Sequence, residues 1–192
     1  MKKTITILSF AITVLIAYAA MPGPSSSGAP ASHTGAPGEK TCATVGCHDD
    51  NAINEGTASL SIEVGDGIKK YIAGQTYPIK IRISDANKHR FGFQITAVNA
   101  ETQTNLGSFV ITDTKRTQTV KNAYTLKERD YVTYTFNGTD AVSNGVGEWI
   151  VNWTAPKNSS EPVTFYVGAV SANDDMTDKG DKVYTSSLTL NK

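Results

Sequence analysis

The sequence predicts an all-β protein, an antiparallel β-sandwich that follows an irregular N-terminal segment. From about residue 58 onward, apolar and polar residues alternate with period two in short runs. Glycine and asparagine turn signals such as Asn137-Gly138 and Lys179-Gly180 separate these runs. No segment carries the apolar stripe of a helix. Strands with one buried face and one solvated face, joined by tight turns, are typical of such sandwiches.

The clearest strands are predicted where the alternation is strictest. In residues 77–83 and 91–97, large apolar residues occupy every second position. Trp149, Val151 and Trp153 share one face of a further strand, and the residues from Val163 to Ala169 alternate in the same way. We interpret the two tryptophans as core residues, because large aromatic side chains are mostly buried. Weaker strands are predicted at Leu60–Val64, Leu106–Ile111, Tyr131–Phe136 and Val183–Leu190.

The first 19 residues have the features of a secretory signal peptide. Two lysines open the chain, an uncharged run from Ile5 to Ala19 follows, and Ala17-Tyr18-Ala19 matches the cleavage consensus. The run is short for a membrane span, and we expect none in the mature chain. Residues 20–32 are rich in Pro, Gly, Ser and Ala and are predicted to form a flexible linker. Residues 33–192 are then the folded domain.

Composition narrows the classes of function. The chain has 18 basic and 18 acidic residues, and two of the basic ones lie in the predicted signal peptide. The mature protein is therefore close to neutral, which argues against nucleic acid as a partner. The sequence contains no hydrolase or transferase motif, so we predict that it is not an enzyme. Export implies a periplasmic or extracellular location, where disulfides persist.

The motif with the most chemistry is the segment from Cys42 to His48. It contains both cysteines of the chain, in a Cys-x₄-Cys-His pattern. Two thiols followed directly by a histidine resemble the attachment site of a c-type haem, although the common spacing has two intervening residues. This reading predicts haem c, with Cys42 and Cys47 as the thioether residues and His48 as the proximal iron ligand. The protein would then transfer electrons to a redox partner protein or a small electron carrier.

Three residues are candidates for the sixth iron ligand. They are His89, His33 and Met176, and of the two histidines we favour His89, at the start of a predicted strand. A second imidazole gives a lower reduction potential than a thioether.

Two alternatives remain open for the same motif. In an oxidising compartment, Cys42 and Cys47 form a disulfide, which closes a short loop and stabilises the fold by about 2 kcal/mol. The protein is then a non-catalytic binding or adhesion module for a protein or glycan ligand. The other alternative is a zinc or copper ion held by Cys42, Cys47 and His48, completed by a fourth ligand such as His33, His89 or Asp49.

Several separate stretches also resemble one known group, the bacterial Reeler-like domains, which are also called choice-of-anchor V domains. The resemblance covers residues 27–190. It is carried by Ser27-Gly28-Ala29-Pro30, Thr34-Gly35-Ala36-Pro37-Gly38-Glu39 leading into Thr41-Cys42 and Cys47-His48, Arg90-Phe91-Gly92-Phe93-Gln94, Trp153-Thr154-Ala155-Pro156, Val163-Thr164-Phe165-Tyr166, Gly180-Asp181 and Tyr184-Thr185-Ser186-Ser187-Leu188.

The resemblance implies an immunoglobulin-like sandwich. It also implies the haem roles of Cys42, Cys47 and His48, since bacterial members often carry a Cys-x₂-Cys-His motif that resembles a haem-attachment site. Animal relatives in the Reelin group are extracellular modules in which a disulfide explains the corresponding cysteine. Because Lys192 follows directly on the last predicted strand, we expect a free domain without an anchoring region.

Overall fold

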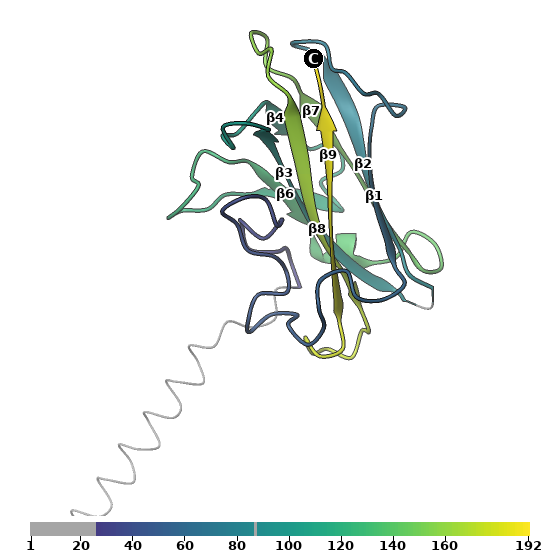
Figure 1. The fold of residues 1–192 in the computed structure, drawn as a ribbon. Coiled ribbons are helices and arrows are strands. Elements are labelled where there is room, and N and C mark those ends of the chain that lie inside the picture. Colours follow the sequence, from purple (N-terminus) through teal and green to yellow (C-terminus); the bar gives the residue numbers. More distant parts are fainter. Residues whose placement is uncertain (1–25, 87) are drawn as a thin grey trace, which may run out of the picture.

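Two antiparallel sheets face each other in the computed structural model, which describes residues 26–86 and 88–192 (Figure 1). The four-stranded sheet has the order β1-β2-β7-β4, and the five-stranded sheet has the order β5-β6-β3-β8-β9. The predicted immunoglobulin-like β-sandwich is confirmed. The strands are β1 (Ser59–Val64), β2 (Thr76–Ser84), β3 (Arg90–Asn99), β4 (Ser108–Val110), β5 (Thr117–Val120), β6 (Tyr131–Tyr134), β7 (Val146–Thr154), β8 (Val163–Ala172) and β9 (Lys182–Leu190), with one 3₁₀ turn, η1 (Phe136–Thr139).

The core lies between the sheets and follows the predicted alternation. Ile79 and Ile81 of β2 are fully buried, and their partners across the β2–β7 ladder are Val151 and Trp149. Trp149 stacks on Phe93 from the opposite sheet, with 4.5 Å between the ring centroids. Trp153 is fully buried, and its indole nitrogen donates a hydrogen bond of 2.9 Å to a backbone carbonyl. The prediction that both tryptophans are core residues is therefore confirmed.

Strand β5 was not predicted. Its sequence, Thr-Gln-Thr-Val, has a single strongly apolar residue and so lacks a visible alternation. It pairs with β6 at the edge of the five-stranded sheet, and Thr117 is its one buried residue. Edge strands need less apolar surface than central ones, because one of their sides has no neighbouring strand.

The outer face of the five-stranded sheet lies under residues 26–56, which we call the N-terminal segment. Strand β3 is consequently buried along almost its whole length, including polar positions such as Gln94 and Thr96. The Gln94 carboxamide accepts a hydrogen bond from the His33 backbone N–H at 2.8 Å and donates one to the Pro30 carbonyl at 2.8 Å. Gly168 of β8 allows this close approach, since a Cβ there would lie 2.7 Å from the His33 carbonyl oxygen.

This arrangement differs from the prediction for part of the linker. Within predicted residues 20–32, Ala29 and Ser32 are buried, and the Ala29 N–H donates to the Thr133 hydroxyl at 3.1 Å. The small Pro-, Gly- and Ser-rich sequence fits closely against the sheet because it has few side chains to accommodate. The predicted signal peptide, residues 1–19, lies outside the described residues. No helix in the described ranges has the length and apolar character needed to cross a bilayer.

Candidate functional site

The Cys42–His48 loop is a series of tight turns whose two ends meet. The Thr44 N–H donates to the Thr41 carbonyl at 3.1 Å, and the Cys47 N–H donates to the Thr44 carbonyl at 2.8 Å. The His48 N–H then donates to the Cys42 carbonyl at 3.1 Å. The last of these bonds brings the backbones of the two cysteines together, and both sulfurs are free thiols in the structure.

Cys42 is turned toward the sheet. Its residue is 8% exposed and packs against Val170 of β8 and Val183 of β9 in a small apolar cluster. Burial raises the pKa of the Cys42 thiol to about 12, and the nearby Cys47 adds to the shift. A thiol in an apolar site stays protonated because the thiolate would lose its hydration. Cys47 is half-buried.

His48 fixes the loop to the turn between β8 and β9. Its Nδ1 lies 2.8 Å from Oδ2 of Asp181, whose side chain is 2% exposed. The contact has the distance of an ion pair but not the angle of a hydrogen bond, so Nδ1 has no hydrogen-bond partner. The other Asp181 oxygen, Oδ1, accepts from the Asn173 N–H at 2.9 Å. Asp181 therefore ties together the loop and both strands of the hairpin.

The same turn carries a second tie to the loop. Lys179 Nζ lies 2.9 Å from Asp50, 3.4 Å from Asp49 and 3.3 Å from Asp178. The hydrogen bond to Asp50 is the largest of the effects that raise the pKa of Lys179. The same bond lowers the pKa of the Asp50 carboxyl. Lys179 thus compensates the negative charge of Asp49, Asp50 and Asp178. Its contacts also join Asp49 and Asp50 to the hairpin.

The three candidates for a sixth ligand lie in three different segments of the fold. The ring Nδ1 of His33 lies 2.9 Å from the Pro30 carbonyl oxygen, within the N-terminal segment. His89 stands before β3, where its carbonyl accepts from the Ala141 N–H, and Met176 is 93% exposed at the hairpin tip. Among the described residues, no group of three or more His, Cys, Asp or Glu side chains is placed to hold a metal ion. The zinc or copper alternative finds no supporting cluster there.

The packing of Cys42 does not fit a covalently attached haem. A thioether needs the sulfur at the edge of a porphyrin, whereas the Cys42 side chain lies against Val170 and Val183. Attachment would require the Cys42 sulfur to leave this apolar cluster. The roles of Cys42, Cys47 and His48 as haem residues stay predictions from the sequence.

Sequence reasoning missed the buried polar contacts that seat the N-terminal segment. The Glu39 carboxylate is fully buried, and its Oε1 lies 2.6 Å from Nη1 of Arg129, which is 3% exposed. The Tyr131 hydroxyl donates to the same Oε1 at 2.8 Å, and burial raises the pKa of this tyrosine. Arg129 also donates to the Gln103 carbonyl at 2.8 Å. No local pattern signals this pair, because its members are 90 residues apart.

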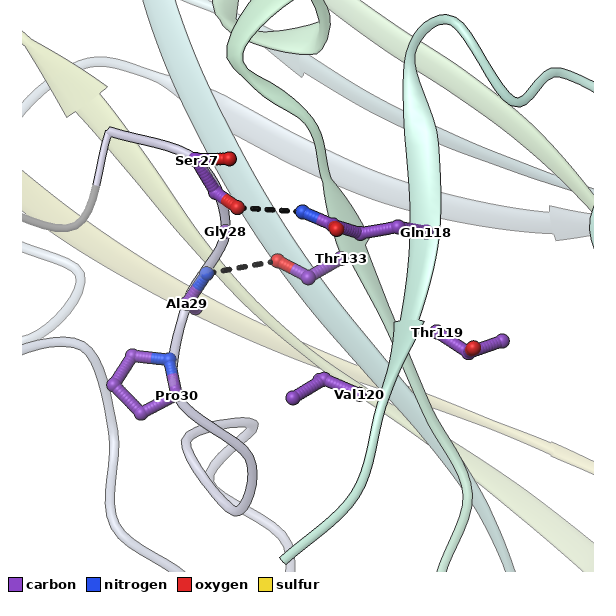
Figure 2. Close-up of a pocket in the computed structure, with 8 residues that line it drawn as sticks. All are labelled: Ser27, Gly28, Ala29, Pro30, Gln118, Thr119, Val120 and Thr133. Atoms are coloured by element: carbon purple, nitrogen blue, oxygen red, sulfur yellow. Dashed lines mark hydrogen bonds between the residues drawn. The ribbon is translucent and has the colours of Figure 1, made fainter.

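Two open grooves flank the N-terminal segment on the outer face. The first has a volume of about 280 Å³ and lies between residues 27–30 and strand β5 (Figure 2). Figure 2 shows the Pro30 ring and the Val120 side chain on its opposite sides. The Gln118 amide crosses the groove and donates to the Ser27 carbonyl. Thr133 of β6 also lines it.

The second groove has a volume of about 290 Å³ and lies where the N-terminal segment meets β8 and β9. We call it the Tyr166 groove. Its lining is neutral and rich in hydroxyl groups, comprising Thr34, Gly35, Tyr166, Thr185, Ser186 and Ser187. Alternate hydroxyl residues along β9, at Thr185, Ser187 and Thr189, are the one signal in the sequence that marks this surface.

Comparison with known proteins decides the family. The model of the Reeler domain matches residues 40–175, which is more than half of the chain. The chain belongs to the Reeler domain family. A comparison with curated proteins gave no match.

Solved Reeler domains share the fold described above. The human F-spondin reeler domain (fragment 1) is similar over 74% of this chain and 94% of its own, with 19% identity and a TM-score of 0.53. The Reelin-N domain of F-spondin is similar over 76% of this chain and 95% of its own, with 19% identity and a TM-score of 0.50. At this identity the likeness shows the fold.

These findings correct the predicted function. The prediction of an electron-transferring, cytochrome c-like haem domain is wrong: the family is that of Reeler domains, and the described residues contain no group placed to hold a metal. The motif misled because two cysteines and a histidine also serve a structural role. Here Cys42 packs on the sheet and His48 contacts Asp181, so both side chains hold the loop in place.

Proposed function

We propose that this Reeler domain is an exported, non-catalytic module that binds a protein or glycan partner outside the cytoplasm. The match to the Reeler family over residues 40–175 is the observation that carries the proposal. A sandwich alone does not select a function, because this architecture carries many. The two open grooves beside the N-terminal segment support binding, since their linings are formed by neutral side chains and backbone.

Export is supported by the sequence of residues 1–19. A basic start, an uncharged run and the Ala17-Tyr18-Ala19 site are the features by which secretion machinery recognises and cleaves a leader. Cleavage after Ala19 leaves residues 20–192 as the mature protein in the periplasm or beyond.

In that compartment we expect Cys42 and Cys47 to form a disulfide. The 3.1 Å hydrogen bond from His48 N–H to the Cys42 carbonyl supports this pairing, because it holds the ends of the loop together. Two thiols lose two protons and pass two electrons to a thiol–disulfide oxidoreductase of the exporting cell, and one S–S bond forms. Closing this short loop stabilises the fold by about 2 kcal/mol.

The test is to express the full chain with its leader in a secreting host that also matures c-type cytochromes. We expect a colourless protein that begins at Ala20 and is two hydrogens lighter than its dithiol form. The purified protein should then bind saturably, without altering its partner, to at least one member of an immobilised panel of extracellular polysaccharides and matrix proteins. A product with a covalent haem, or the absence of saturable binding across the panel, contradicts the proposal.

A further inference from the structure

The Tyr166 groove has unused hydrogen-bonding capacity. Within the described residues, the hydroxyls of Tyr166 and Ser187 make no hydrogen bond to the protein. The Thr185 hydroxyl accepts a bond from the Asn54 amide at 3.3 Å and keeps its own proton free to donate. Each hydroxyl offers one donor and two acceptor positions, so the groove presents several of both kinds to a ligand.

The groove also has one aromatic surface. Tyr166 of β8 is half-buried and stands directly opposite the exposed Ser187 in the β8–β9 ladder. A tyrosine ring offers an apolar face and a polar end, which suits a ligand with C–H groups on one side and hydroxyls at its rim. The ring and the hydroxyls are held on paired strands, so they need little ordering when a ligand binds.

The lining excludes a charged ligand. None of the six residues that line the groove is ionisable at neutral pH, so an anion would lose hydration without gaining a counter-charge. A cation would likewise find no carboxylate there. The volume of about 290 Å³ is just below the usual range for ligand sites and suits one or two rings.

An added peptide strand would meet an occupied edge at one end of the groove. Peptides commonly join a sheet through the free backbone of an edge strand. Here Asn54 occupies that edge of β9: its N–H donates to the Val183 carbonyl at 2.8 Å, and its side-chain oxygen accepts from the Thr185 N–H at 2.9 Å. The Val183 carbonyl and the Thr185 N–H, which a peptide would use at this end of the groove, are therefore already bonded.

We propose that the Tyr166 groove binds a neutral saccharide, with a sugar ring against the Tyr166 ring and its hydroxyls bonded to Ser187 and Thr185. Gly35 forms the low wall of this site. A Cβ at Gly35 would lie 3.3 Å from the Thr185 methyl group, so a larger side chain there would crowd the ligand. The inference rests on the proposed binding function and names the ligand class of one of its grooves.

The test is a titration of the ¹⁵N-labelled mature protein with neutral tetrasaccharides of glucose, galactose and mannose, each followed by NMR. We expect saturable shifts of the Gly35, Tyr166 and Ser187 amides with at least one of them. Tyr166→Leu should weaken that binding by about tenfold or more through loss of the ring and its hydroxyl, and Tyr166→Phe by about two- to tenfold, the range of one hydrogen bond. A sulfated tetrasaccharide serves as the charged comparison.

Ser187→Trp fills the groove and should abolish saccharide binding. Ser108→Trp places the same side chain on an exposed strand position of the other sheet and should leave binding unchanged. Saturation with no neutral sugar, preference for the sulfated one, or binding that survives Ser187→Trp overturns the inference. If Ser187→Trp still binds a partner in the panel assay while no neutral sugar binds the wild type, the sugar site fails and the binding function stands.

Discussion

The outer face of the four-stranded sheet is open to solvent, whereas that of the five-stranded sheet lies beneath the N-terminal segment. On the open face, Arg82 and Glu148 pair at 2.8 Å with both side chains partly exposed. On the covered face, Glu39 and Arg129 pair at 2.6 Å with almost no exposure. The two pairs have similar geometry and very different surroundings. Polar residues on the open face keep the sheet soluble, and those on the covered face hold a second layer in place.

The largest effect is expected where a buried charge loses its partner. Glu39→Ala leaves the Arg129 guanidinium beneath the N-terminal segment with carbonyl acceptors but no counter-charge. We expect the free energy of unfolding to fall by about 3–5 kcal/mol, which urea denaturation measures. If Glu39→Ala lowers the free energy of unfolding no more than the loss of an exposed ion pair does, burial does not make the pair on the covered face more important than the pair on the open face.

A smaller effect is expected from the neutral contact at the centre of the covered face. Gln94→Ala removes the acceptor for the His33 N–H and the donor to the Pro30 carbonyl, both at 2.8 Å. Unfolding should become easier by about 1–3 kcal/mol, and the His33 amide should exchange its hydrogen faster. Unchanged protection of this amide would show that other contacts seat the segment.

The strands that the sequence predicted are those whose burial follows a local period. In β2, Tyr77, Ile79, Ile81 and Ile83 face the core at every second position, and each needs only its own strand to be recognised. Bounds of the weak strands varied: Leu60–Val64 became β1, one residue longer, whereas only Ser108–Val110 of the predicted Leu106–Ile111 forms a strand. The function was predicted wrongly, because a motif of Cys42, Cys47 and His48 does not reveal what lies against it.

Local sequence patterns did not predict that the N-terminal segment covers the five-stranded sheet. Gln94 and Thr96 occupy the positions of β3 that alternation assigns to solvent, and they are fully buried. Their partners come from far away in the chain: the contact between Ala29 and Thr133 spans 104 residues. A polar residue at an outward-facing strand position can form its hydrogen bonds with water or with a covering backbone segment. The sequence of the strand is the same in both cases, so one sequence alone does not show whether the face is covered.

The reduced protein should show a pH dependence that comes from the covered face. The pKa of Cys42 rises from 9.0 to about 12 on folding, because burial disfavours the thiolate. Its contribution to stability is complete below about pH 9 and is lost as the pH rises toward about 12, since only the unfolded chain gives up the proton in that window. The midpoint temperature of the reduced wild type should therefore fall more steeply above pH 9 than that of reduced Cys42→Val. Parallel curves would contradict the buried position of the thiol.

The smallest effect belongs to the open face. Glu63 lies 3.9 Å from Lys80 across β1 and β2, with both side chains about half exposed. Glu63→Ala should change the free energy of unfolding by less than about 0.5 kcal/mol in the same urea experiment. It is also the matched control for Glu39→Ala, since both remove one glutamate from one ion pair. If Glu63→Ala lowers the free energy of unfolding by several kcal/mol, exposure to solvent does not explain why the two ion pairs differ in their contribution to stability.

The seating of the N-terminal segment sets an order of events during biosynthesis. The Asn51 side chain donates to the Asp181 carbonyl across 130 residues, so the segment leaves the ribosome long before its docking surface exists. Contacts of such separation form late in folding. A nascent chain that stops short of β9 therefore has the partners of the segment on β3 and β6 but lacks those of the Cys42–His48 loop around Asp181. Docking of this loop marks a chain that has been made as far as the β8–β9 hairpin.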